Sequence, residues 1–327
     1  MDVCSKDVVV LLTVYNRPSV KSTIESVLNQ TFKDYQLLII DNASDDGTYE
    51  IMQEYAAKDE RIVLIRNERN MGQTYSLHRG MSLIKGKYIA RIDADDLMLP
   101  TRLEKQYNFL EQNPEYAVCG SWVQFITDDD RLGPVIRNCT TNEAVNVIQH
   151  IKCGFAHPAI MMRKETLDKY GLGYDKMYKM AEDYDLWRQI LLHAKGTNLG
   201  EVLTLYRRGD NNDSEKNRSI TDDEAYAVRK QIIENDLDGK SKRRMIHLLK
   251  IEEKERKSLV TAIYAYVLYK KYVRDSLDKN NPDYSFICKG IPFTILGAYV
   301  QQNSALWAKL VGSAYRRLRK RIYKRYR

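Results

Sequence analysis

The 327-residue sequence lacks the features of a membrane-spanning or exported protein. No uninterrupted apolar run approaches the roughly 20 residues that a membrane span needs. The best candidate, Ile291–Val311, is broken by the polar residues 301–304. The N-terminus has no basic region followed by a long apolar core, because Val8–Val14 is too short for a signal peptide and is typical of a strand. We therefore expect a cytoplasmic protein.

Cysteine and glycine motifs are also sparse. The five cysteines are odd in number and widely spaced, and no Cys-x-x-Cys occurs. This pattern argues against a disulfide framework or a zinc site and suits a reducing compartment. The sequence contains neither Gly-x-Gly-x-x-Gly nor Gly-x-x-x-x-Gly-Lys-Ser/Thr. A Rossmann dinucleotide site and a P-loop are therefore disfavoured.

The excess of basic residues is confined to the end of the chain. The formal net charge is +8, and Arg316–Arg327 contains eight basic residues and no acidic one. The same segment and the residues before it include Leu306, Trp307, Leu310 and Tyr315. A basic amphipathic helix with aromatic residues favours an anionic membrane surface, as a peripheral attachment to the inner face of the cell membrane. Nucleic-acid binding, which we do not expect, and a solvated charged tail are the alternatives.

Buried strand patterns alternate with helical patterns in the first third of the chain. The expected strands are Val8–Leu12, Gln36–Ile40, Ile62–Ile65 and Lys87–Ile92. This alternation predicts an α/β fold with a mostly parallel sheet flanked by helices. After residue 220 the pattern is helical over 221–236, 242–272 and 291–323. We thus expect one domain over 1–220 and a helical C-terminal region over 221–327.

Polar residues follow three of the expected strands, at Tyr15-Asn16, Asp41-Asn42 and Asp93-Ala94-Asp95-Asp96. Ligands of such sheets bind outside the carboxyl ends of the strands, so these residues should converge on one site. Carboxylates at the end of a buried strand are costly unless they are neutralised. Mg²⁺ takes one or two carboxylates plus substrate phosphates. The acidic segment therefore indicates a place where a metal ion and a nucleotide diphosphate meet, or else a solvated acidic loop.

With these residues in view, the sequence resembles the GT-A domain of glycosyltransferase family 2 over residues 7 to 207. The segments that carry the resemblance occur in the family's order: Thr13-Val14-Tyr15-Asn16-Arg17, Ser26-Val27-Leu28-Asn29-Gln30-Thr31-Phe32, Ile39-Ile40-Asp41-Asn42-Ala43-Ser44-Asp45-Asp46-Gly47-Thr48, Gly86-Lys87-Tyr88-Ile89-Ala90, Asp93-Ala94-Asp95-Asp96, His157-Pro158-Ala159 and Glu182-Asp183-Tyr184-Asp185-Leu186-Trp187. The resemblance implies an inverting enzyme that moves a sugar from a nucleotide-sugar donor to a saccharide or lipid-linked acceptor.

The resemblance also implies a donor site and a metal site. The donor-binding set would be Thr13, Tyr15, Asn16, Asp41, Asn42, Gly72, Asp93 and Arg207. In it, Thr13 and Tyr15 would line the base and ribose pocket, and Asp41-Asn42 would hold the base edge. Many relatives have a second Asp at the position of Asn42, so deoxythymidine and guanosine donors stay open beside uridine donors. Asp95 would bind Mn²⁺ or Mg²⁺ directly, and Asp93 would face the ribose or a metal-bound water.

On the acceptor side, the resemblance implies that Asp183 is the general base, with Glu182 as the fallback. Taken alone, Asp183 is more typical of an ordinary helix N-cap carboxylate. His157 and Trp187 would lie beside the acceptor, although a structural histidine is an equal alternative for His157. A nucleotidyltransferase acting on sugar phosphates would share the sheet and the metal carboxylates but would not need a base such as Asp183. A nucleic-acid-binding protein is the third alternative, and it depends on the basic tail alone.

Overall fold

The computed structural model describes residues 4–208, 216–254 and 259–288. The chain divides into two compact units, residues 1–228 and 229–327. The basic segment Arg316–Arg327 and the helix expected over 291–323 lie outside the described residues. No helix within the described ranges is long and apolar enough to cross a membrane. The domain boundary expected at residue 220 stays a prediction.

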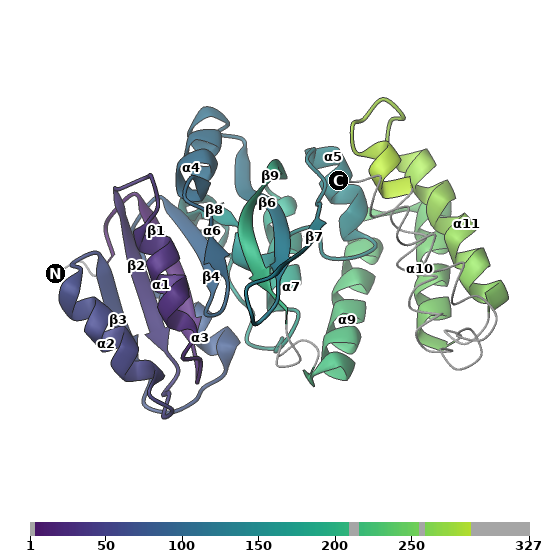
Figure 1. Ribbon diagram of the computed structural model, residues 1–327. Coiled ribbons are helices and arrows are strands. Elements are labelled where there is room, and N and C mark those ends of the chain that lie inside the picture. The colour runs from purple at the N-terminus through teal and green to yellow at the C-terminus, as the bar shows by residue number, and fades with distance from the viewer. Residues whose placement is uncertain (1–3, 209–215, 255–258, 289–327) are drawn as a thin grey trace. The chain divides into compact units, whose positions relative to one another are not determined.

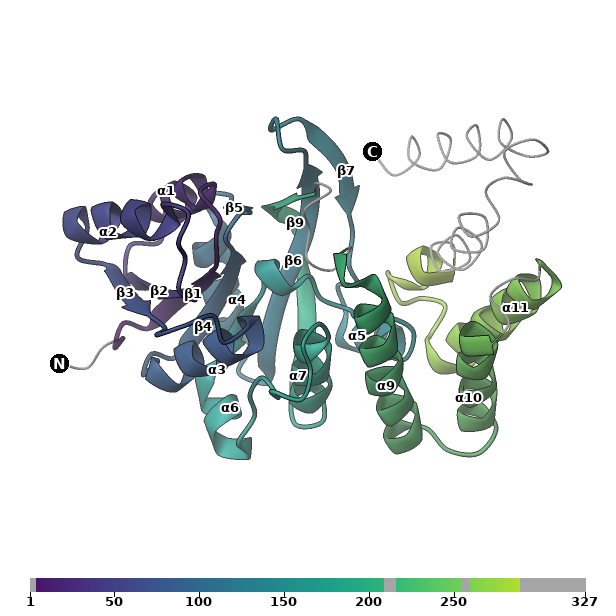
Figure 2. The ribbon, with the colours of Figure 1, turned by 90° about the horizontal axis from the view of Figure 1, so that it is seen from below.

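The N-terminal half of the first unit is the α/β arrangement that the sequence predicts (Figure 1). Its strands are β1 (Val8–Val14), β2 (Tyr35–Asp41), β3 (Ile62–Arg66) and β4 (Tyr88–Asp93). They pair in parallel in the order β3-β2-β1-β4. The connecting helices are α1 (Val20–Leu28), α2 (Thr48–Lys58) and α3 (Gln73–Leu83). Figure 2 shows α1 and α2 on one face of these strands and α3 on the other.

Close packing on both faces explains the continuous apolar runs. Val8, Val10 and Leu12 of β1 belong to the core cluster beneath α1, and every residue from Val8 to Leu12 is fully buried. On the opposite face, Gly80 of α3 approaches β1 so closely that an added Cβ would lie 2.3 Å from the Leu11 side chain. A strand covered on both faces cannot alternate polar with apolar residues, so it reads as a continuous apolar segment.

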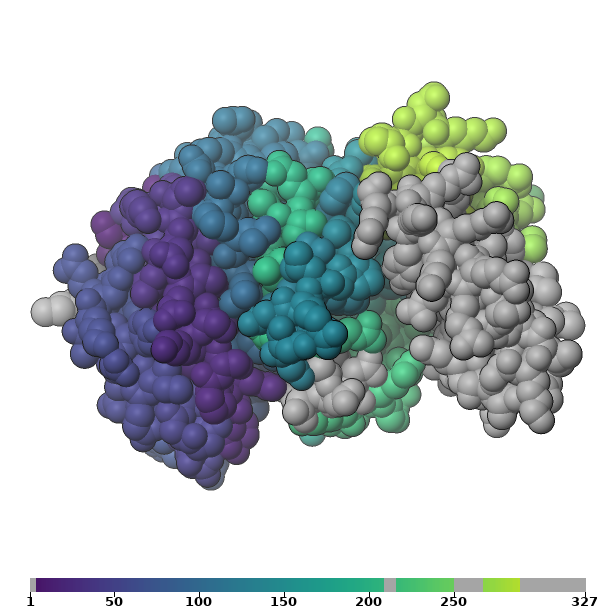
Figure 3. Space-filling model, in the orientation of Figure 1, coloured from purple at the N-terminus to yellow at the C-terminus, as the bar shows by residue number. Residues whose placement is uncertain are grey.

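The sheet continues from β4 into a mixed half. The order after β4 is β8 (Met161–Arg163), β6 (Tyr116–Ile126), β9 (Lys195–Arg207) and β5 (Leu97–Met98), and β7 (Leu132–Ile136) pairs with β6. β8 is antiparallel to both neighbours, whereas β6 and β9 are parallel to each other with register shifts. The other elements of this half are α4 (Arg102–Gln112), α5 (Asn142–Gln149), the short 3₁₀ helix η1 (His157–Ala159), α6 (Lys164–Tyr170) and α7 (Glu182–Leu191). The two halves of the first unit abut without a break on the face shown in Figure 3.

The remaining described elements are helical. α9 (Arg218–Asp236) begins in the first unit and ends in the second. The second unit contains α10 (Gly239–Lys254) and α11 (Leu259–Ser276), which lie within or beside the helical range expected over 242–272, and residues 255–258 are outside the described ranges. An ion pair of 2.9 Å joins Arg244 of α10 to Asp275 of α11. The helical character expected after residue 220 is confirmed as far as the structure describes that region.

Candidate active site

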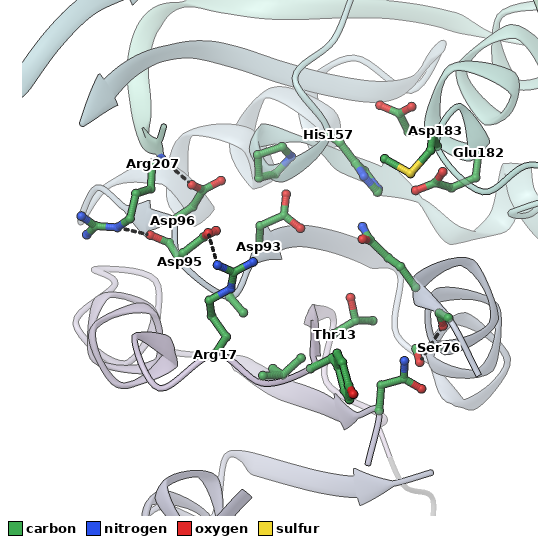
Figure 4. A pocket seen from close by; sticks show the side chains of 18 of the residues that line it. Thr13, Arg17, Ser76, Asp93, Asp95, Asp96, His157, Glu182, Asp183 and Arg207 are labelled. Carbon is green, nitrogen blue, oxygen red and sulfur yellow. Dashed lines mark hydrogen bonds and ion pairs between the residues drawn. The ribbon is translucent and has the colours of Figure 1, made fainter. Parts of the chain in front are cut away.

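A cavity of about 820 Å³ opens at the carboxyl ends of β1 and β4. Its size is that of a site for a drug-sized ligand or cofactor. The predicted site residues that line it are Thr13, Tyr15, Asn16, Asn42, Gly72, Asp93, Asp95, His157, Glu182, Asp183 and Arg207. The topological rule thus brings together residues from both ends of the first unit. Figure 4 shows Asp95 and Arg17 on one side of the cavity, and Glu182 and Asp183 on the other.

The acidic segment after β4 forms the wall around Asp95. The Asp95 carboxylate lies 3.8 Å from the Arg17 guanidinium, and Asp96 accepts a hydrogen bond of 2.7 Å from the backbone N–H of Arg207. The Arg207 guanidinium donates to the backbone carbonyl of Asp95 at 3.0 Å and pairs with Asp130 at 2.7 Å. Arg207 therefore fastens the end of β9 to this segment (Figure 4).

Negative charge accumulates at this wall. Burial, together with the charge of Asp93, raises the pKa of Asp95, and burial with the charges of Asp93 and Asp95 raises the pKa of Asp96 well above its usual range. Burial alone would raise the pKa of Asp93, but the charge of Arg91 lowers it. This wall therefore disfavours the charged forms of Asp95 and Asp96, and a bound cation would favour them.

These residues fit a divalent metal ion that is shared with a substrate. Among the described residues, no group of three or more His, Cys, Asp or Glu side chains could hold a metal ion. Mg²⁺ does not require such a group, because it commonly uses one or two carboxylates and completes its shell with water and substrate phosphates. Asp95 lines the cavity, and the buried Oδ2 atom of Asp96 has no hydrogen-bond partner within the described part of the chain. Carboxylate oxygens of this kind are ligands for Mg²⁺ or Mn²⁺.

Asn42 organises a different wall of the cavity. Its Oδ1 accepts hydrogen bonds from the Asn67 side chain and from the backbone N–H of Met71, both at 2.9 Å. Its Nδ2 donates to Asn70 Oδ1 at 2.7 Å, and this oxygen also accepts from the backbone N–H of Gly72. The acceptor that was expected to hold the base edge is thus already used by the protein. An amide at position 42 supports the 70–72 loop, a task that needs both a donor and an acceptor.

Two predicted site residues do not line the cavity. Asp41 is fully buried, accepts the backbone N–H of Ser44 at 3.1 Å and pairs with Arg66 at 3.1 Å. It therefore holds the loop after β2 instead of offering its carboxylate to a base. Trp187 is also fully buried, and its ring lies 6.0 Å from that of His157 in an edge-on contact. The indole packs against His157, so the direct acceptor contact expected of it is absent in this geometry.

The first turn of α7 carries two carboxyl groups that line the cavity, those of Glu182 and Asp183. Burial, with the neighbouring charge of Asp183, raises the pKa of Glu182 to about 8. Burial raises the pKa of Asp183 to about 6, although its Oδ1 accepts the backbone N–H of Tyr184 at 2.6 Å. Cys153 contributes its Sγ atom 3.9 Å from Asp183 Oδ2. At neutral pH this pair would hold one proton, on Glu182, and Asp183 would be an available base.

His157 joins these carboxyl groups to the centre of the cavity. Its Nε2 atom lies 2.7 Å from the hydroxyl of Tyr174. Burial and the charge of Arg91 lower the pKa of His157 to about 3, so the imidazole is neutral. His157 lines the cavity and is also held by a structural hydrogen bond, but to a side chain and not to the backbone. The hydrogen bond to Tyr174 is a structural role, and the acceptor-side role of His157 stays a prediction.

Sequence reasoning missed several residues of the site. Arg91 is fully buried beside Asp93 and influences the pKa values of Asp93 and His157. The sequence could have indicated Arg91, because a charged residue in the middle of an apolar strand needs a partner of opposite charge or a hydrogen-bond acceptor. Tyr174 and Glu224 gave no comparable signal. Glu224 of α9 accepts hydrogen bonds from three successive backbone N–H groups, those of residues 179–181, directly before Glu182.

Comparisons with known proteins show the family and the fold to which the chain is similar. Residues 9–171 match the family model described as Glycosyl transferase family 2. The uncharacterized glycosyltransferase MJ1057 of Methanocaldococcus jannaschii is 38% identical over 208 residues, which cover 61% of this chain and 69% of that protein. The O-antigen biosynthesis glycosyltransferase WbnJ of Escherichia coli is 35% identical over 192 residues, covering 57% and 72%. The crystal structure of S. aureus TarS 1–349 in complex with UDP-GlcNAc has a TM-score of 0.60 at 15% identity, covering 90% and 92%, and shows the shared fold.

Proposed function

Because the chain belongs to glycosyltransferase family 2 and is a glycosyltransferase, we propose that it transfers a sugar from a nucleoside-diphosphate sugar to a hydroxyl group of a saccharide or lipid-linked saccharide, with inversion at the anomeric carbon. The observation that carries this proposal is the arrangement of carboxyl groups in one cavity. Asp95 lies on one side and the Glu182–Asp183 pair on the other (Figure 4). A one-step displacement needs this separation, with the leaving diphosphate and the base on opposite sides of the sugar.

The donor is proposed to lie across the ends of β1 and β4. Thr13 and the half-exposed Tyr15 line the cavity there, and the Tyr15 ring is available to stack on a base. A uridine nucleotide is the first candidate, a choice supported by the UDP-GlcNAc complex of the similar TarS structure. Since Asn42 is occupied by Asn67, Met71 and Asn70, base selection would fall to other groups of this wall. Deoxythymidine and guanosine donors therefore stay in the test.

The chain's own residues would act on the acceptor. Asp183 would accept the proton of the attacking hydroxyl group, because it is the more acidic member of the buried pair. Glu182, protonated at neutral pH, would leave Asp183 as the single negative charge at that end of the cavity. Arg17 and Arg207 lie on the opposite side, next to Asp95, where negative charge develops on the leaving group. A bound Mg²⁺ or Mn²⁺ would supply Lewis-acid stabilisation of the departing diphosphate.

The proposed setting is the synthesis of a surface polysaccharide at the inner face of the cell membrane. The O-antigen role named for WbnJ supports the setting, and the basic residues of Arg316–Arg327 support the location. Anionic vesicles test the attachment. The full chain should float with them, and a full-length variant with these eight basic residues changed to glutamine should not. Equal flotation of both proteins would contradict a membrane role for this segment.

The reaction class is tested by product analysis. The protein is incubated with a panel of nucleotide sugars and Mn²⁺ or Mg²⁺, and the released nucleotide is identified. The proposal expects a nucleoside diphosphate from one preferred donor. Release of pyrophosphate from a nucleoside triphosphate and a sugar phosphate would instead indicate a nucleotidyltransferase. Absence of any turnover, with tight nucleic-acid binding that weakens steeply with salt, would indicate a nucleic-acid-binding protein.

A further inference from the structure

Glu224 makes an unusual set of contacts outside the cavity. Its Oε2 atom accepts hydrogen bonds from the backbone N–H groups of Met180 at 2.8 Å, Lys179 at 3.0 Å and Ala181 at 3.1 Å. Its Oε1 atom also accepts from Lys179 at 3.1 Å. Three successive N–H groups thus converge on one carboxylate. Hydrogen bonds to a charged acceptor are about twice as strong as those between neutral groups.

The last of these N–H groups belongs to the N-cap residue of α7, and the other two lie directly before it. Ala181 is the N-cap residue of this helix and makes no side-chain capping bond. Alanine is a poor N-cap because it has no acceptor for the free N–H groups of the first turn. Glu224, from a different helix 43 to 45 residues further along the chain, instead accepts the N–H of this N-cap residue and of the two residues before it. It therefore fixes the backbone that enters α7, whose first residues are Glu182 and Asp183.

We infer that Glu224 is a positioning residue for the Glu182–Asp183 pair. This inference rests on the proposed function and deepens it, because it explains what fixes the base in the cavity. Further along α7, Leu186 and Trp187 are fully buried, so the body of the helix is held by its core contacts. Upstream, Thr74 of α3 binds the carbonyl of Tyr178 at 2.9 Å. Between these anchors, the carboxylate of Glu224 sets the backbone that leads into Asp183.

The position of a base matters more than its mere presence. A misplacement of about 1 Å can reduce a rate about 100-fold. Removing the Glu224 carboxylate would leave the N–H groups of residues 179–181 without their acceptor, so the backbone that enters α7 would loosen and Asp183 would sample other positions. Donor binding should be spared, because Thr13, Tyr15 and Asp95 belong to β1, β4 and the residues after them.

The test compares the full-length variants Glu224→Ala and Glu224→Gln with Asp223→Ala. Asp223 is the exposed neighbour in the same helix, so its substitution removes the same charge without touching this contact. Amide hydrogen exchange of peptides covering residues 179–185 reads the contact directly and needs no activity. Glu224→Ala should lose protection there at least tenfold, Asp223→Ala should not, and Glu224→Gln should keep part of it through its amide oxygen. Unchanged exchange in Glu224→Ala overturns the inference.

Kinetics then test the positioning role itself. Glu224→Ala should lower kcat of transfer about 10- to 100-fold, while the donor KM changes less than twofold. In an Asp183→Asn background the same substitution should cause no further loss, since the group that it positions is absent. An equal loss in both backgrounds, or an unchanged kcat with lost protection, contradicts the inference. A wild-type chain that transfers no sugar contradicts the proposed function, and the exchange result then still decides whether Glu224 holds the start of α7.

Discussion

Glu182 and Asp183 stand next to each other in the first turn of α7, but their carboxyl groups lose their protons at different pH. Burial raises the pKa of Asp183 to about 6, and burial with the charge of Asp183 raises the pKa of Glu182 to about 8. Pairs of carboxyl groups whose environments separate their pKa values are characteristic of acid–base sites. The lower pKa favours Asp183 over Glu182 for the proposed role of general base.

The first prediction concerns the pH dependence of transfer. A general base must be deprotonated, so kcat should fall as pH drops through about 6, by about tenfold per pH unit below it. An aspartate of ordinary pKa would keep its activity down to about pH 4. Initial rates at saturating donor and acceptor between pH 4.5 and 8 provide the measurement. A rate that stays level to pH 4.5 would rule out the raised pKa of Asp183 as a property of the working enzyme.

A second prediction concerns stability. Folding raises the pKa of Glu182 from its ordinary value of 4.5 to about 8, so the folded protein holds this proton more tightly than the unfolded chain. Ionisation therefore opposes folding, beginning as pH rises above about 4.5 and reaching its full extent above about 8. Glu182→Gln removes this opposition and should stabilise the protein by up to about 5 kcal/mol at pH 9 but little at pH 4.

Denaturant unfolding at the two pH values measures this effect. The exposed Glu165 of α6 supplies the control, since Glu165→Gln changes the same chemical group at the surface. Its free energy of unfolding should change by less than about 0.5 kcal/mol at either pH. If Glu182→Gln destabilised the protein equally at pH 4 and pH 9, ionisation of Glu182 would not oppose folding, and the prediction would be wrong.

The third prediction concerns Asn42. Asn42→Ala removes the acceptor of two donors and the donor to Asn70, so buried polar groups of the 67–72 loop lose their partners. The expected loss in the free energy of unfolding is about 1–3 kcal/mol, with a raised KM for the donor. The exposed Asn29→Ala serves as the control. If Asn42→Ala kept the wild-type free energy of unfolding but had a strongly raised donor KM, Asn42 would instead contact the base edge directly.

The fourth prediction concerns Arg102, which is fully buried in α4. Its guanidinium donates to the carbonyl oxygens of Pro158 and Arg91, both at 2.6 Å, and of Ile160 at 3.1 Å. It thereby ties the segment of His157 to β4. Arg102→Met should cost about 3 kcal/mol or more in urea unfolding, because several buried carbonyl groups lose their donor. Lys105→Met on the same helix is the more exposed counterpart, and a similar loss there would contradict the assignment.

The N-terminal half of the fold could be predicted because its signals are local. Val8–Leu12 and Gln36–Ile40 are apolar runs followed by polar turns, and the chain alternates strands with helices. The mixed half is different, since its pairings join distant segments. Leu97 of β5 pairs with Leu205 of β9, and β6 lies between β8 and β9. No local pattern encodes such partners, because they are selected by the packing of the whole unit.

The same distinction applies to the site. The rule that ligands bind at the carboxyl ends of strands is enough to bring Tyr15, Asn42 and Asp95 to one cavity. Asp41 reads like its neighbour Asn42 in the sequence, but strand alternation turns its carboxylate into the protein, toward Arg66. Glu224 follows two other acidic residues of α9, so nothing local distinguishes it from the exposed Asp223. Only the long-range contact reveals it.

In the proposed reaction, Asp95 and Asp183 serve opposite ends of one displacement. The most direct measurement compares wild type, Asp95→Ala and Asp183→Asn for thermal stabilisation by the preferred nucleotide sugar with Mn²⁺ and for transfer to an acceptor. Asp95→Ala should lose the metal-dependent stabilisation and about 10² to 10³ in kcat/KM. Asp183→Asn should keep the stabilisation and lose about 10² to 10⁴ in kcat. Full transfer by Asp183→Asn, or unchanged metal-dependent binding by Asp95→Ala, would contradict the account.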